Sequence, residues 1–315
     1  MREFRPRVSP THHNDLSTWL ALPLALSVLS ACADSLSNEG ISVRQRSQIA
    51  SRAALASGPR IYVTNLLNNT VTVYKPNGKR TIPTIRDGID MPRAVAVDGT
   101  GKIYVANIGN DTVTTYKPDG KRTTPTIREL HFPTGIAIDT AGKIYVTNYS
   151  SNSVTTYDSS GEKVQPEIRA GLNGPYGIAV DAGGKIYVSN ALGSNVTTYL
   201  PNGSRSEPTI KQLDNPTGVA LGPSGKIYVS SFLDNMVLTY HHSGKFGHPT
   251  ITQGIGGPCF IATDDQRRIY VANYAPPPGS PPTGYVTVYS KRGFQATKLT
   301  ISTGIDGPVG IAISK

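Results

Sequence analysis

Cysteine is nearly absent from this chain of 315 residues, which contains only Cys32 and Cys259. A small fold held together by several disulfides is therefore excluded, and stability must come from packing. Charged residues are also scarce, at 17% of the chain, whereas 37% of the residues are hydrophobic and 32 are glycine. This composition argues against an intrinsically disordered chain and is typical of a globular protein with many tight turns.

The apolar stretch STWLALPLALSVLSAC, at residues 17–32, is too short for a comfortable membrane span. It has the length of a signal-peptide core and follows three arginines, so it predicts a secretion signal over residues 1–32. Its last residues, LSAC, resemble the lipobox of bacterial lipoproteins, and this resemblance implies lipid attachment to Cys32. Cleavage near Ala33 by an ordinary signal peptidase is the alternative.

Residues 33–58 have few large apolar side chains and no strand-like alternation, which predicts a flexible tether. The formal net charge of +10 raises the question of nucleic-acid binding. Export argues against nucleic acid and favours anionic lipid headgroups, wall polymers or acidic proteins as partners. Contact with a membrane is expected through the lipid anchor only.

The sequence contains six copies of one pattern. The tripeptide Ile-Tyr-Val recurs with a period of 41 or 42 residues, beginning at Ile61, Ile103, Ile144, Ile186, Ile227 and Ile269. Each copy holds four short runs rich in β-branched and aromatic residues, separated by turn residues, which predicts four antiparallel strands. Four such strands per repeat are typical of a propeller blade. We therefore expect an all-β, six-bladed β-propeller over residues 59–315, with repeats starting near 60, 102, 143, 185, 226 and 268.

The two ends of the repeat region complement each other. The first copy begins at Ile61 with the second strand of a blade, and the chain ends with GPVGIAISK, an innermost strand without a blade of its own. Pairing of residues 310–314 with residues 61–65 is therefore predicted. This pairing closes the ring and removes the exposed sheet edges of an open array.

The repeat resembles a known family. The segment PTGIAIDTAGKIYVTN at residues 133–148, with SVTTY after it, is similar to the NHL-type propeller repeat. The YVTN motifs at residues 62–65 and 145–148 resemble the YVTN repeats of bacterial surface proteins. The resemblance covers residues 60–315 and implies the propeller fold. It implies no single function, because propellers serve as enzymes, receptors and scaffolds.

Regularly repeated polar residues are expected to be structural. Twelve tyrosines belong to the repeat and are expected to fill the wedge between blades. An asparagine follows Ile-Tyr-Val-X in five of the six copies and is expected to cap a turn. The recurring aspartates after the innermost strand, such as Asp98, are assigned to hairpin turns on the opposite face.

Residues that depart from the repeat mark a candidate ligand site. They fall on the face that carries the crossovers between blades, where many propellers bind ligands around the central channel. The predicted ligand-binding residues on this face are Arg93, Tyr149, Tyr176, Phe232 and Tyr274. The alternative is that the aromatic residues plug the channel or pack under loops. The insertion APPPGSPPTG, residues 275–284, is expected to form a stiff rim on this face.

The family resemblance also suggests enzymes as an alternative. Calcium-dependent lactonases and a zinc-dependent amidating lyase have related folds, but no convergent carboxylates or histidines are visible here, so no metal site, cofactor or catalytic residue is predicted. Virginiamycin-inactivating lyases need a histidine with nearby acids, and the candidate pair is His131 with Glu129. Cys259 is expected to be a buried, inert thiol.

The sequence thus favours an exported, lipid-anchored protein that faces the periplasm or the cell surface. Its expected role is a binding or scaffolding module, monomeric, that presents one propeller face to a protein, a glycan or another ligand. The alternative is a lactonase or lyase with an unrecognised divalent-metal site.

Overall fold

The structure is a computed structural model that describes residues 58–275 and 284–314. The chain divides into the units Met1–Ala50 and Ser51–Lys315, and the described residues all belong to the second. The predicted secretion signal, the tether up to residue 57, Cys32 and most of the proline-rich insertion lie outside the described residues. Within the described ranges, no helix has the length and apolarity needed to span a membrane.

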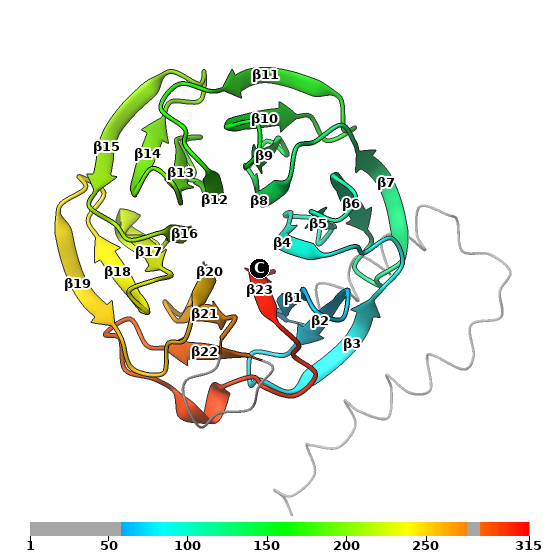
Figure 1. The fold of residues 1–315 in the computed structure, drawn as a ribbon. Helices are drawn as coiled ribbons and strands as arrows, with labels where there is room; N and C mark the ends of the chain where they lie inside the picture. The colour runs from blue at the N-terminus through cyan, green and yellow to red at the C-terminus, as the bar shows by residue number, and fades with distance from the viewer. Residues whose placement is uncertain (1–57, 276–283, 315) are drawn as a thin grey trace, which may run out of the picture. The chain divides into compact units, whose positions relative to one another are not determined.

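The fold is a six-bladed β-propeller, as the repeat predicted (Figure 1). From the channel outwards, blade 1 contains β23 (Pro308–Ile313), β1 (Ile61–Asn65), β2 (Thr70–Tyr74) and β3 (Arg80–Ile85). Blade 2 contains β4 (Pro92–Val97), β5 (Ile103–Asn107), β6 (Thr112–Tyr116) and β7 (Arg122–Ile127). Blade 3 contains β8 (Pro133–Ile138), β9 (Ile144–Asn148), β10 (Ser153–Tyr157) and β11 (Lys163–Ile168).

The second half of the ring follows the same order. Blade 4 contains β12 (Pro175–Val180), β13 (Ile186–Asn190), β14 (Asn195–Tyr199) and β15 (Arg205–Lys211). Blade 5 contains β16 (Pro216–Leu221), β17 (Ile227–Ser231), β18 (Met236–Tyr240) and β19 (Phe246–Ile251), with a short 3-10 turn at Pro223–Gly225. Blade 6 contains β20 (Pro258–Thr263), β21 (Ile269–Asn273) and β22 (Tyr285–Tyr289).

The ring closes where the last strand meets the first. Strand β23 pairs antiparallel with β1, placing Ile61 opposite Ile313 and Asn65 opposite Pro308. Figure 1 shows the red C-terminal strand completing the innermost position of the blue first blade. The predicted pairing is confirmed, and it leaves the inner edge of β1 covered rather than free to pair with another chain.

The outer position of blade 6 departs from the pattern. Two isolated bridges, Tyr289 with Gln295 and Val286 with Ile301, replace a continuous outer strand, and a 3-10 turn lies between them at Thr297–Leu299. In blade 5 the equivalent stretch, Phe246–Ile251, is one residue shorter and pairs as a strand. The extra residue in blade 6 forces the chain out of register between its two bridges.

The tyrosines of the repeat tie the blades together. Tyr104 in β5 is 2% exposed, and its hydroxyl donates to Asp98, whose other carboxylate oxygen accepts from main-chain N–H groups of the inner turn. Tyr116 in β6 is fully buried and donates to the main-chain carbonyl of Asp87, in the crossover from the preceding blade. The structural roles predicted for the tyrosines and for the turn aspartates are therefore confirmed in this blade.

A ring of buried asparagines organises the end of the propeller that carries the crossovers, called the top face from here on. Asn107, at the end of β5, accepts a hydrogen bond from the main-chain N–H of Asp90 at 3.1 Å. The residues that make the equivalent contact in other blades are Asn65, Asn148, Asn190 and Asn273. The predicted turn-capping role is confirmed, and it fixes each crossover over its blade.

Candidate functional site

One position of the repeat places its side chain at the rim of the channel, on the top face, in every blade. It follows the capping asparagine or serine, and in the six blades it is occupied by Leu66, Ile108, Tyr149, Ala191, Phe232 and Tyr274. The main-chain N–H at this position donates to a crossover carbonyl, as Tyr149 does to Phe132 and Tyr274 to Gly257. These bonds hold the three aromatic side chains at the top face, where the sequence placed them.

A second position lies at the start of each innermost strand, directly after its proline. Thr134, Thr217, Cys259 and Val309 occupy it in four blades and are buried. Thr134 and Thr217 donate to main-chain carbonyls of the following blade, so their hydroxyls join sheets. The other two residues at this position, Arg93 and Tyr176, instead meet each other across the channel mouth.

Arg93 and Tyr176 form the centre of the candidate site. The Arg93 guanidinium lies over the Tyr176 ring, with Cζ 5.0 Å from the ring centroid, and its Nη2 donates to the Tyr176 hydroxyl. Arg93 belongs to blade 2 and Tyr176 to blade 4, so the contact passes the innermost strand of blade 3. Cation–π contact and hydrogen bonding together fix the position of the guanidinium.

Aromatic rings extend this centre in two directions. Tyr149 meets Tyr176 edge-on, with centroids 6.4 Å apart and an interplanar angle of 89°. On the other side, Phe260 from the innermost strand of blade 6 lies 5.9 Å from Tyr176. Phe132 lies 5.9 Å from Tyr149 and continues the aromatic row outwards along the top face. Each such aromatic pair contributes about 0.5–1.5 kcal/mol to stability beyond the burial of its surface. The rings in this row therefore hold one another in position.

In the part of the chain that the structure describes, the positive charge of Arg93 has no counter-charge. Burial lowers the pKa of Arg93, and Cys259, Tyr274 and Tyr149 are the groups that oppose this effect. Burial raises the pKa of Cys259 to about 11, so this thiol is neutral at pH 7. The Nε–H of Arg93 is buried without a hydrogen-bond partner in the described part of the chain, and none of the ion pairs found there includes Arg93.

Exposed apolar side chains surround this centre. Nine large hydrophobic residues of the described chain are exposed, and five of them belong to the loops of the top face. These five are between 37% and 61% exposed, and they are Leu67, Met91, Phe132, Leu192 and Leu233. The top face therefore combines an uncompensated arginine, an aromatic row and an apolar rim.

The structure brings four of the five predicted ligand-binding residues into one cluster, Arg93 with Tyr149, Tyr176 and Tyr274. Phe232 lies on the same rim but packs against the neighbouring crossover, where a Cβ on Gly257 would meet its ring at 3.3 Å. The apolar rim was not predicted. Its signal is a leucine two residues after the cap in three loops, at Leu67, Leu192 and Leu233.

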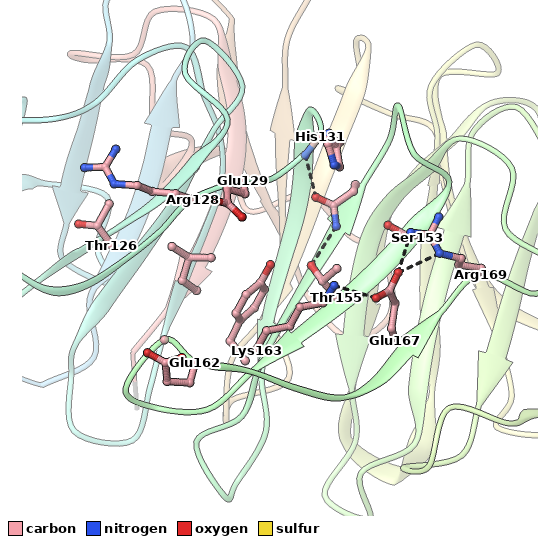
Figure 2. Close-up of a pocket in the computed structure, with 14 residues that line it drawn as sticks. Thr126, Arg128, Glu129, His131, Ser153, Thr155, Glu162, Lys163, Glu167 and Arg169 are labelled. Atoms are coloured by element: carbon pink, nitrogen blue, oxygen red, sulfur yellow. Dashed lines mark hydrogen bonds and ion pairs between the residues drawn. The ribbon is translucent and has the colours of Figure 1, made fainter.

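A separate cavity of about 300 Å³ lies between blades 2 and 3, away from the channel (Figure 2). Glu129 and His131, the pair suggested by the lyase resemblance, line it together with Tyr157. Figure 2 shows Glu167 between two basic side chains, Lys163 at 2.8 Å and Arg169 at 2.7 Å. The two basic side chains share this one carboxylate.

The cavity exists because one crossover is short. The crossover Ile127 to Pro133 has one residue fewer than the equivalent segment from Ile85 to Pro92. The longer crossover offers a carbonyl to the tyrosine of the next blade, but Tyr157 finds no such partner among the described residues. Lys163, the first residue of the outer strand, forms an ion pair with Glu167, so its side chain does not fill the space beside Tyr157.

A second short crossover shows how such a space can be filled. The segment from Ile210 to Pro216 also lacks one residue, and Tyr240 in the next blade likewise makes no bond to it. Here the outer strand starts with Phe246, whose ring packs edge-on against Tyr240 with centroids 5.7 Å apart. The blade with the cavity at Tyr157 begins its outer strand with lysine instead of phenylalanine.

A metal site was not predicted. Within residues 58–275 and 284–314, no group of three or more His, Cys, Asp and Glu side chains is arranged to hold a metal ion.

Comparison with known proteins shows likeness at the level of fold. No protein-family model and no curated protein matches the chain. A chain of a nidogen/laminin complex is 16% identical with a TM-score of 0.69, over 82% of this chain and 99% of that one. A Bacteroides caccae protein of unknown function is 13% identical with a TM-score of 0.66, over 82% of this chain and 99% of that one.

Enzymes occur among the similar structures too. A catalytically inactive virginiamycin B lyase from Staphylococcus aureus, crystallised with quinupristin, is 15% identical with a TM-score of 0.55. That match covers 80% of this chain and 78% of the lyase. At these identities the comparisons show the propeller fold, which binding proteins and enzymes share.

Proposed function

We propose that this chain is a binding module of the bacterial cell envelope whose top face binds a protein partner. The observation that carries the proposal is the apolar rim around the Arg93–Tyr176 centre. Clusters of exposed apolar residues mark interaction surfaces, and tyrosine and arginine are enriched where binding energy concentrates. In this protein both features occur on one face.

The origin of one similar structure supports a protein partner. The chain with a TM-score of 0.69 comes from a complex between nidogen and laminin, so a propeller of closely related shape takes part in a protein–protein complex. The resemblance of residues 62–65 and 145–148 to the YVTN repeats of bacterial surface proteins agrees with such a role. The proposal includes a monomeric propeller that binds no nucleic acid.

The location of the module is part of the same proposal. Residues 1–32 direct export, Cys32 carries lipid, and residues 33–58 hold the propeller away from the membrane towards the periplasm or cell surface. Replacing Cys32 with serine in the full chain tests this. The parent is expected in the membrane fraction and Cys32→Ser in the soluble exported fraction. An equal distribution of the two would contradict lipid anchoring.

A pair of matched variants tests the contact face. Leu233 is 61% exposed on the top face, and Leu200 is 41% exposed in a turn at the opposite end of its blade. We expect Leu233→Asp to reduce recovery of the partner by co-purification, because it places a charge within the apolar contact. Leu200→Asp is the control and should leave recovery unchanged. Equal recovery with both variants would rule out the top face.

A further inference from the structure

Arg93 is desolvated, and none of the ion pairs among the described residues includes it. Its Nε–H is buried without a partner in residues 58–275 and 284–314, and its Nη2 donates to the Tyr176 hydroxyl. Burial of a charge is unfavourable unless an opposite charge or hydrogen bonds compensate.

Two tyrosine hydroxyls belong to the same site as the guanidinium of Arg93. Tyr149 meets the ring of Tyr176 edge-on, and Tyr149 and Tyr274 both pack against the cluster that contains Tyr176 and Cys259. Neither hydroxyl forms a hydrogen bond to the residues that the structure describes. A phenol can donate to an anionic oxygen. The site therefore offers one fixed cation and further donors, with the aromatic row of Tyr149, Tyr176 and Phe132 around them.

We propose that the centre formed by Arg93, Tyr149, Tyr176 and Tyr274 binds a carboxylate group carried by the partner. This inference rests on the proposed function, since it names the chemical group that the top face recognises. A guanidinium forms short, charge-assisted hydrogen bonds with a carboxylate, and the ring of Tyr176 keeps it oriented for that contact.

The single charge of the site selects a carboxylate over a phosphate. Among the residues that occupy the two top-face positions in the six blades, Arg93 is the one cation. A carboxylate neutralises Arg93, whereas a phosphate dianion would leave one negative charge in a desolvated aromatic site. The adjoining aromatic row suits a carboxylate attached to an apolar or aromatic group.

Small probes test the proposal without the partner. Binding of phenylacetate, its neutral analogue phenylacetamide, and inorganic phosphate to the purified full chain is measured by calorimetry. We expect phenylacetate to bind about tenfold or more tightly than phenylacetamide, because the amide lacks the charge. Phosphate should bind more weakly than phenylacetate. No detectable phenylacetate binding, equal binding of acid and amide, or tighter binding of phosphate would each overturn the proposal.

Three variants test whether the preference for the acid over the amide arises at Arg93 and Tyr149. Arg93→Gln removes the charge and should abolish the preference for the acid over the amide, while Arg205→Gln, at an exposed arginine on the outer strand of blade 4, should retain it. Tyr149→Phe keeps the ring and removes one donor, so it should weaken phenylacetate binding and leave the weak amide binding unchanged. Retention of the preference in Arg93→Gln would overturn the assignment.

A second set of probes identifies the source of the carboxylate. N-acetylphenylalanine presents a chain terminus, and N-acetylglutamate α-amide presents a side chain. The probe that binds more tightly identifies the source of the carboxylate. If neither probe binds, recognition of a protein carboxylate is contradicted. Failure here is separable from failure of the proposed function: loss of the partner in Leu233→Asp without any carboxylate binding would refute this inference alone.

Discussion

The guanidinium of Arg93 lies 5.0 Å from the ring centroid of Tyr176, although blade 3 separates the blades to which the two residues belong. The contact joins the walls of the channel at its top and places the positive charge near the axis. Most of the other charged side chains lie on turns and outer strands. The contact between a desolvated arginine and a tyrosine ring thus lies at the top of the channel.

Removing the charge of Arg93 should not harm the fold. Because the guanidinium is desolvated and forms no ion pair with a described residue, Arg93→Met is expected to leave the free energy of unfolding unchanged or to raise it. Denaturant unfolding of the parent and the variant measures this. A loss of stability greater than about 1 kcal/mol would mean that Arg93 is a structural residue rather than a binding residue.

Two equivalent tyrosines should respond differently to loss of their hydroxyls. Tyr116→Phe removes the 2.6 Å hydrogen bond to the Asp87 carbonyl and should reduce the free energy of unfolding by about 1 kcal/mol. Tyr157→Phe, at the short crossover, removes no such bond and should cost much less. The comparison uses denaturant unfolding of both variants. Equal losses would contradict the explanation of the cavity between blades 2 and 3.

Alkaline conditions should unfold the propeller. Burial raises the pKa of Tyr187 and of Tyr285 to about 12 from an ordinary value of 10.0. The folded state therefore favours the neutral phenol, and this contribution to stability is fully present below pH 10 and is lost as the pH rises from 10 towards 12. Phenolate absorbance and circular dichroism are followed together. We expect one coupled transition, and titration near pH 10 with an intact sheet would contradict it.

Closure by the last strand should be essential to the ring. Deleting residues 308–315 removes β23, uncovers the inner edge of β1 and exposes side chains of its neighbours. We expect loss of the cooperative unfolding transition and association of the truncated chain through the open edge. Size-exclusion chromatography and thermal unfolding measure these effects. A monomeric truncated chain with an unchanged transition would show that closure is dispensable.

The repeat made the fold predictable, because every blade repeats the strand signals and the two chain ends complement each other. The irregular outer segment of blade 6 was not predicted. The sequence there has one extra residue and lacks the proline found in the outer strands of the other blades, such as Pro249 in β19. A count of residues between Gly293 and Ile301 would have shown the change of register.

The candidate site could be predicted only in part. Departure from the repeat pointed to Arg93 and Tyr176, yet Thr134 and Cys259 share their position and are buried between blades. Which of these side chains crosses the channel depends on its length and on the packing of neighbouring sheets, and neither follows from spacing. The cavity at Tyr157 depends on a single missing crossover residue, whose effect appears only when blades are packed together.

Photo-crosslinking in intact cells tests the central claim most directly. A photoreactive residue is placed at Leu192, 58% exposed on the top face, or at Leu200, 41% exposed at the opposite end of the same blade. The proposed function predicts a discrete cross-linked protein product from Leu192 and none from Leu200. A product from Leu200 alone, or none from Leu192, would contradict binding by the top face.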